Sequence, residues 1–126
     1  MLESFGPVGN AKAKILILGS MPGAASLKAG QYYAHPRNSF WPIIENALGA
    51  KGRLSYAKRL ALLKKNRIAL WDVLAQCARP GSADSAIDMK TAMANDFKTF
   101  FAEHKGIRMV FFNGTKAREC YKRYVM

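Results

Sequence analysis

Three short apolar runs, each followed by a loop rich in small and polar residues, constrain the fold of this chain most strongly. The runs lie at about Lys14 to Leu18, Arg67 to Trp71 and Arg108 to Asn113. Their aliphatic, β-branched and aromatic residues follow one another almost without polar side chains, which is typical of strands buried on both faces of a parallel sheet. We therefore predict three parallel strands, each opening into a loop at its carboxyl end.

Amphipathic stretches alternate with these runs and predict the helices. Apolar residues recur three or four positions apart in each stretch, and capping or breaking residues mark several of the ends. The first predicted helix runs from about Phe40 to Leu48, and the second follows the capping residue Ser55 and continues through Leu63. The third contains Met93, Phe97, Phe100 and Phe101 and ends near Gly106, and the fourth starts near Thr115.

The segment from Asp72 to Asp88 has no strong periodicity and contains Pro80 and Gly81, so we predict a long ordered loop there. With 126 residues, half of them hydrophobic, the chain can bury one core and is predicted to form one domain. The carboxyl ends of the three strands lie at one edge of the predicted sheet, where open α/β sheets bind their ligands.

The charge of the chain indicates a polyanionic partner such as nucleic acid. The formal net charge is +12 and the sequence pI is about 10.1, although a solvated basic surface is an alternative. No apolar run approaches the roughly 20 residues of a membrane helix, and the N-terminus lacks a secretory signal, so we expect a cytoplasmic protein. Cys77 and Cys120 lie far apart without metal-ligand spacing, which favours reduced, structural thiols.

Four sequence blocks carry a specific resemblance. They are Gly19-Ser20-Met21-Pro22-Gly23, the run from Tyr32 to Trp41, Pro80-Gly81-Ser82-Ala83-Asp84, and Phe112-Asn113-Gly114. In order and spacing these blocks resemble the uracil-DNA glycosylase superfamily, and most closely its mismatch-specific and deoxyinosine (hypoxanthine) glycosylase branch. The resemblance covers about residues 14 to 120.

This resemblance implies an α/β fold, a three-layer α/β/α sandwich with a short, mainly parallel central sheet, over residues 1–126. It also implies a base-excision enzyme that hydrolyses the N-glycosidic bond of deaminated bases, deoxyinosine first and uracil or xanthine next, in double-stranded DNA. No metal, organic cofactor or obligate protein partner is implied. Family members have a further strand and a loop that enters the minor groove, whereas this sequence ends at Met126, so we expect a C-terminally incomplete domain.

Hydrolysis of this bond places positive charge on the sugar and negative charge on the base, so a water must be oriented while the base is stabilised. The catalytic Asn of the deoxyinosine branch resembles Asn38, whose carboxamide can accept a hydrogen bond from the water. The alternative is that Asn38 only caps the following helix. Tyr33 resembles the aromatic residue on which the extruded base stacks, and its alternative is a half-buried loop aromatic.

The remaining candidates divide into base-binding and phosphate-binding groups. Met21 stands where mismatch-type relatives carry an Asn, and Asp72 could either read the base or only hold its loop in place. The predicted base-binding residues are Ser20, Met21, Tyr33, Asp72 and Asn113, and the predicted phosphate contacts are Gly23, His35 and Arg37. Arg79 is a further candidate for phosphate contact, with a solvated charge as its alternative, and His35 has a structural hydrogen bond as its alternative.

Two other function classes stay open at the level of sequence. A catalytically weak DNA-binding module could keep the same fold and charge without hydrolysing the glycosidic bond at an appreciable rate. A flavodoxin-like protein that binds a small ligand would use the same edge of the sheet, but it would not need the basic charge.

Overall fold

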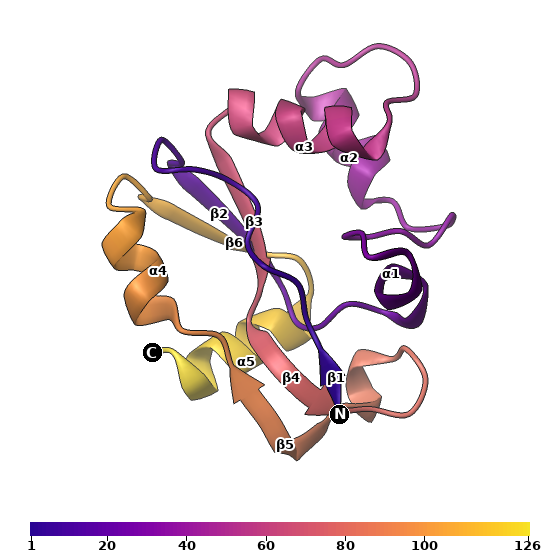
Figure 1. Cartoon of the computed structure of the whole chain (residues 1–126), viewed down its shortest axis with the longest axis vertical. Helices are drawn as coiled ribbons and strands as arrows, with labels where there is room; N and C mark the ends of the chain where they lie inside the picture. Colours follow the sequence, from indigo (N-terminus) through magenta and orange to yellow (C-terminus); the bar gives the residue numbers. More distant parts are fainter.

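The computed structural model describes residues 1–126 and contains two three-stranded sheets (Figure 1). The parallel sheet has the order β3-β2-β6 and consists of β2 (Ile15–Gly19), β3 (Ile68–Asp72) and β6 (Met109–Phe112). The second sheet is antiparallel, has the order β1-β4-β5, and consists of β1 (Leu2–Glu3), β4 (Leu74–Ala78) and β5 (Asp88–Ala94). The predicted α/β class with a short, mainly parallel central sheet is confirmed.

Helices cover both faces of the parallel sheet because its strands carry apolar side chains on both faces. Leu16 and Leu18 of β2 belong to the larger core cluster, which α4 (Phe97–Glu103) and α5 (Thr115–Tyr124) cover. Ile15 and Ile17 pack with a smaller cluster beneath α2 (Phe40–Ala47) and α3 (Tyr56–Lys65). Figure 1 shows these helix pairs on opposite sides of β2, β3 and β6.

Local capping explains where several helices begin and end. The Ser55 hydroxyl accepts a hydrogen bond from the backbone N–H of Lys58 and starts α3 as predicted. Asp96 caps α4 by accepting from the N–H of Thr99. The short α1 (Ala24–Ala29) ends at Gly30, whose φ of +67° is a left-handed conformation that favours glycine.

Two predictions about the middle of the chain are wrong. The segment from Asp72 to Asp88 is not one long loop, because it contains β4 and the 3₁₀ turn η1 (Asp84–Ala86). Met93 lies in β5, where 57% of its surface is exposed, and not on the apolar side of the helix that begins at Phe97. The antiparallel sheet as a whole was not predicted.

Strand β6 forms one edge of the parallel sheet and presents apolar side chains to solvent. Its only strand partner is β2, and Met109 and Phe111 are about half exposed. Cys77 and Cys120 are buried and unpaired in the larger cluster. None of the helices combines the length and the apolar character needed to cross a membrane.

Candidate functional site

A cavity of about 370 Å³ lies at the carboxyl ends of β2, β3 and β6. Ligand sites typically enclose roughly 300 to 1,000 Å³, so the cavity has the size of a small-molecule pocket. The prediction that three strand-end loops meet at one edge of the sheet is confirmed. Eight of the nine predicted site residues line this cavity, namely Ser20, Met21, Gly23, Tyr33, His35, Asn38, Asp72 and Asn113.

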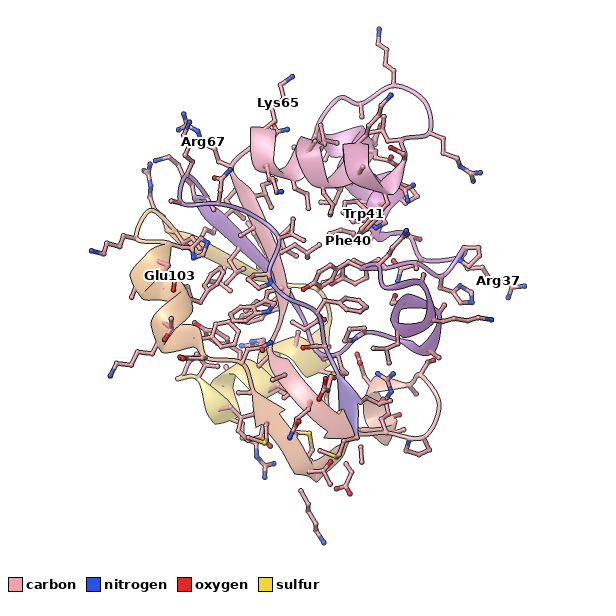
Figure 2. The ribbon with its side chains drawn as sticks, in the orientation of Figure 1. Arg37, Phe40, Trp41, Lys65, Arg67 and Glu103 are labelled. Atoms are coloured by element: carbon pink, nitrogen blue, oxygen red, sulfur yellow. The ribbon has the colours of Figure 1, made fainter.

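Arg37 is the one predicted site residue that does not line the cavity. Its side chain is exposed and points away from the body of the molecule (Figure 2). His35 is also exposed, and its Nδ1 accepts a hydrogen bond from the N–H of Arg37, which matches the structural alternative for His35. This pair therefore shapes the outer part of the loop beside the cavity.

The inner wall of the cavity depends on residue 19 being a glycine, which has no Cβ. Gly19 pairs with Asp72 across β2 and β3, and a Cβ at Gly19 would lie 2.5 Å from Asp72 Oδ1 and 2.7 Å from the Tyr33 hydroxyl. Both distances are shorter than real contacts of a Cβ atom allow. Glycine is therefore required here so that a carboxyl and a phenol can share one buried position.

Tyr33 is held in a strained backbone conformation beside this wall. Its φ of +53° lies in the left-handed region, which costs a non-glycine residue of order 1–3 kcal/mol unless its surroundings impose it. The neighbouring residues supply that constraint: the Tyr32 N–H donates to the Tyr56 hydroxyl at 3.1 Å, and the Ala34 N–H donates to Ser26 Oγ at 3.0 Å. The Tyr33 ring stacks on Phe40, with the ring centres 4.1 Å apart.

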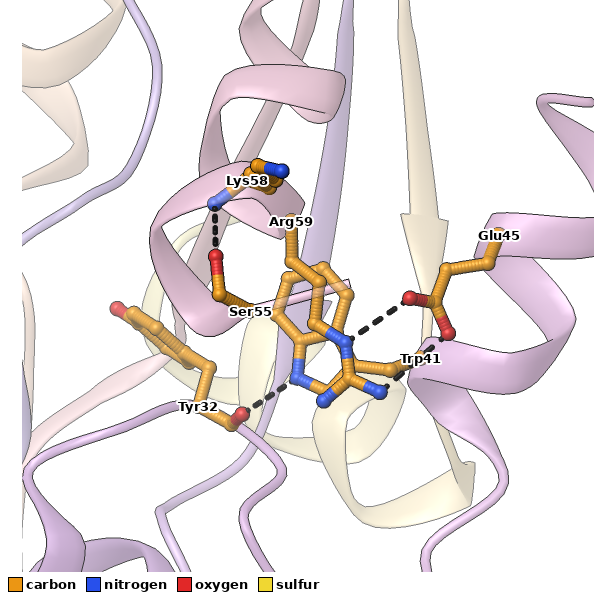
Figure 3. A network of polar contacts seen from close by, with 6 residues as sticks. All are labelled: Tyr32, Trp41, Glu45, Ser55, Lys58 and Arg59. Carbon is orange, nitrogen blue, oxygen red and sulfur yellow. Dashed lines mark hydrogen bonds and ion pairs between the residues drawn. The ribbon is translucent and has the colours of Figure 1, made fainter. Parts of the chain in front are cut away.

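Trp41 completes this support from α2 (Figure 3). Its indole Nε1 donates to the Tyr32 carbonyl at 2.7 Å, and the Arg59 guanidinium lies over its ring while pairing with Glu45. Figure 2 shows Phe40 and Trp41 pointing into the interior, and both are buried. The segment that carries Tyr33 is thus fixed before any ligand arrives.

Replacing Trp41 with phenylalanine is expected to destabilise the protein by about 2 kcal/mol, because the buried Tyr32 carbonyl loses its donor. Urea unfolding followed by circular dichroism measures this change. Trp71→Phe is a matched control, since the Trp71 indole donates to the Phe5 carbonyl at a longer 3.2 Å on the other side of the sheet. A loss below 0.5 kcal/mol for Trp41→Phe would show that the segment does not depend on this hydrogen bond.

Asn38 lies at the mouth of the cavity, one residue before Ser39, the N-cap of α2, and its side chain bonds to the first residue of the helix in place of the capping role that the sequence left as an alternative. Its Oδ1 accepts from the N–H of Phe40 at 2.8 Å, at the start of α2. A carboxamide oxygen has two lone pairs, and the amide nitrogen adds two donors, so this one bond leaves most of its hydrogen-bonding capacity free. The bond to Phe40 and a direct role at the cavity are therefore compatible.

The loop after β2 is fastened to the segment between β4 and β5. The Ser20 hydroxyl donates to Asp84 Oδ1 at 2.6 Å, and Ser82 Oγ accepts from the N–H of Ala24. Arg79 is buried and donates to the carbonyls of Pro22 and Gly81, so it is neither a phosphate contact nor the solvated charge that was its alternative. Sequence reasoning missed Asp84 as a partner because the two halves of this contact lie 64 residues apart.

Asp72 is the electrostatically unusual residue of the site. Its surface is 3% exposed, and burial raises the pKa of its carboxyl from 3.8 to about 7. The nearby Asp84 carboxylate raises this pKa as well, whereas the Arg79 guanidinium lowers it. Burial and the proximity of Asp72 also raise the pKa of the Tyr33 phenol, so this hydroxyl keeps its proton at neutral pH.

The parallel strands and the polar cavity at their ends define an open-sheet α/β protein with a ligand pocket. The chain belongs to the uracil DNA glycosylase superfamily, whose family model matches residues 7–125. This membership confirms the resemblance given by the four sequence blocks.

The relatives agree with this membership over most of the chain. A hypoxanthine DNA glycosylase from Methanosarcina barkeri is 38% identical over 118 residues, which are 93% of this chain and 73% of the relative. A protein of the same description from Methanosarcina acetivorans is 40% identical over the same shares of the two chains. The solution NMR structure of a candidate uracil DNA glycosylase from M. acetivorans is 39% identical, with a TM-score of 0.82 over 96% of this chain and 74% of that one.

Proposed function

We propose that this protein is a DNA glycosylase that hydrolyses the N-glycosidic bond of deaminated bases in double-stranded DNA, with hypoxanthine as its preferred base. The observation that carries the proposal is the gathering of eight motif residues around one cavity in a chain about 40% identical to hypoxanthine DNA glycosylases. The net charge of +12 supports a polyanionic substrate.

The cavity would receive a base that has been rotated out of the duplex, because the bond to be broken cannot be reached within the base stack. Tyr33 would provide a stacking surface on the side of its ring away from Phe40, and the ring's fixed position lowers the entropy lost on binding. Asn113 and Met21 line the same space and would contact the base. The backbone N–H groups near Gly23 would approach a phosphate, as glycine permits.

Asn38 would position the water that attacks the sugar carbon. Its hydrogen bond to Phe40 orients the carboxamide at the mouth of the cavity, where the sugar of an extruded nucleotide has to lie. A carboxamide is a weak proton acceptor, so the reaction would depend mainly on departure of the base and on stabilisation of its negative charge. The phosphates of the DNA would help to stabilise the sugar cation.

The test is an excision assay on end-labelled duplexes that differ at one position, which holds deoxyinosine, uracil, xanthine or unmodified adenine. We expect alkali-labile abasic sites at deoxyinosine at the highest rate, and none at adenine. If every duplex stays intact while salt-sensitive binding persists, the protein is a DNA-binding module instead. If neither binding nor excision occurs, the small-ligand class gains support.

A further inference from the structure

The Asp72 side chain has no structural task in the fold. Its backbone is fixed by pairing with Gly19 across the parallel sheet and by the Asn95 amide, which donates to the Asp72 carbonyl at 2.7 Å. The carboxyl group, in contrast, has its Oδ2 buried without a hydrogen-bond partner, and Asp72 is one of the residues that line the cavity. An unpaired buried polar atom is costly, so it requires an explanation outside the fold itself.

The groups that face this carboxyl do not neutralise it as an ion pair would. Arg79 is the nearby cation, but it forms no ion pair with Asp72: its Nε and Nη2 donate to the carbonyls of Gly81 and Pro22, and its Nη1 is buried without a partner. Asp84 adds a second negative charge, and the phenols of Tyr32 and Tyr33 are neutral donors. The Tyr32 hydroxyl donates to the Gly6 carbonyl, and the Tyr33 hydroxyl is buried beside the Asn113 side chain.

We propose that Asp72 is protonated in the working enzyme and donates a hydrogen bond to the departing base, which makes it a further catalytic residue of the reaction proposed above. A carboxylic acid kept neutral by burial is a strong donor to an oxygen or nitrogen that gains negative charge. An ionised Asp72 would repel the same base, so the reaction depends on this proton.

The space around Gly19 supports this assignment independently of charge. The positions of Asp72 Oδ1 and the Tyr33 hydroxyl are compatible only with a residue that lacks a Cβ, so the chain places the Asp72 carboxyl, whose Oδ2 has no hydrogen-bond partner, beside the phenol at the cavity wall. A neutral carboxyl in this position offers a donor to the edge of a purine or pyrimidine that carries a carbonyl oxygen. Its target is therefore the oxygen-bearing edge that deamination creates.

The pH dependence follows from the direction of the shift. The pKa of Asp72 is higher in the folded protein than in the unfolded chain, so the folded protein binds this proton more tightly. The stability that the proton contributes is fully present below about pH 4 and is lost as the pH rises through about 7. In single-turnover excision with saturating enzyme, we expect the rate on deoxyinosine to fall about tenfold per pH unit above pH 7.

Two substitutions test the proton itself. Asp72→Asn keeps a neutral donor of nearly the same shape, so we expect a rate within about tenfold of the wild type at pH 6 and no alkaline fall. Asp72→Ala removes the donor, and we expect about a 100-fold loss at pH 6. The proposal is overturned if Asp72→Asn is as slow as Asp72→Ala, if it keeps the alkaline fall, or if Asp72→Ala matches the wild type.

A measurement without DNA separates this proposal from the proposed function. We expect the melting temperature of Asp72→Asn minus that of the wild type to be larger at pH 8.5 than at pH 5. At pH 8.5 the buried Asp72 carboxyl of the wild type is ionised, which destabilises its folded state, whereas the asparagine side chain does not titrate. An equal difference at both pH values would show that Asp72 carries no proton, whether or not excision occurs. Absence of excision at every pH together with the expected melting shift would refute the glycosylase function and the donor role while leaving the proton in place.

Discussion

Replacement of Asn38 by alanine is expected to lower the single-turnover rate of deoxyinosine excision by at least about 100-fold, because the attacking water loses the group that orients it. The same substitution removes the acceptor for the Phe40 N–H and should cost about 1 kcal/mol of stability. The rate is measured on the end-labelled deoxyinosine duplex at saturating enzyme, and the stability by urea unfolding.

Asn38→Ser is the matched control that separates catalysis from this hydrogen bond. A serine hydroxyl can accept from the same backbone N–H two residues on, more weakly than asparagine, so it should restore part of the lost stability. Serine lacks the reach and the amide of asparagine, so excision should stay slow. If the serine variant recovers both stability and excision, Asn38 acts only through its bond to Phe40, and the water must be positioned by another group.

Gly19→Ala should abolish most excision while leaving binding to duplex DNA intact. The new Cβ would require both Asp72 and the Tyr33 hydroxyl to move, and displacement of a reacting group by about 1 Å can cost about 100-fold in rate. Overpacking of this kind also destabilises by about 1–3 kcal/mol. Excision and salt-dependent binding on one deoxyinosine duplex measure the two effects separately.

Gly6→Ala provides the comparison for this glycine, because no atom lies within 4 Å of the position its Cβ would take. It should fold and excise the base as the wild type does. If Gly19→Ala behaved in the same way, Asp72 and Tyr33 could not form the wall of the reacting pocket, and the site would have to lie elsewhere.

Strands β4 and β5 were not predicted because their local sequence does not mark them as strands. Only Val73 separates β3 from β4, so no turn residues mark the point where the chain passes from one sheet to the other. Strand β5 contains Asp, Lys and Ala, which strands generally disfavour, and its pairing with β4 has irregular register. Tertiary pairing holds this segment in place against its local preferences.

Some residues of the site could be placed from the sequence, and others could not. Gly19, Asp72 and Asn113 could be placed together because the carboxyl ends of parallel strands meet at one edge. The contact between Ser20 and Asp84 and the burial of Arg79 had no local signal, since each depends on segments more than 50 residues apart. The strained Tyr33 backbone likewise results from donors and acceptors supplied by distant elements.

The sequence by itself determined the parallel strands, the main helices, the family and the loops that form the pocket, because periodicity, capping and a long motif are local properties of the chain. Only the tertiary structure decided which polar groups are paired and which are left without partners. Hydrogen bonding and desolvation depend on every neighbour in space, so the proton on Asp72 could be inferred only after Gly19, Tyr33 and Arg79 had been placed around it.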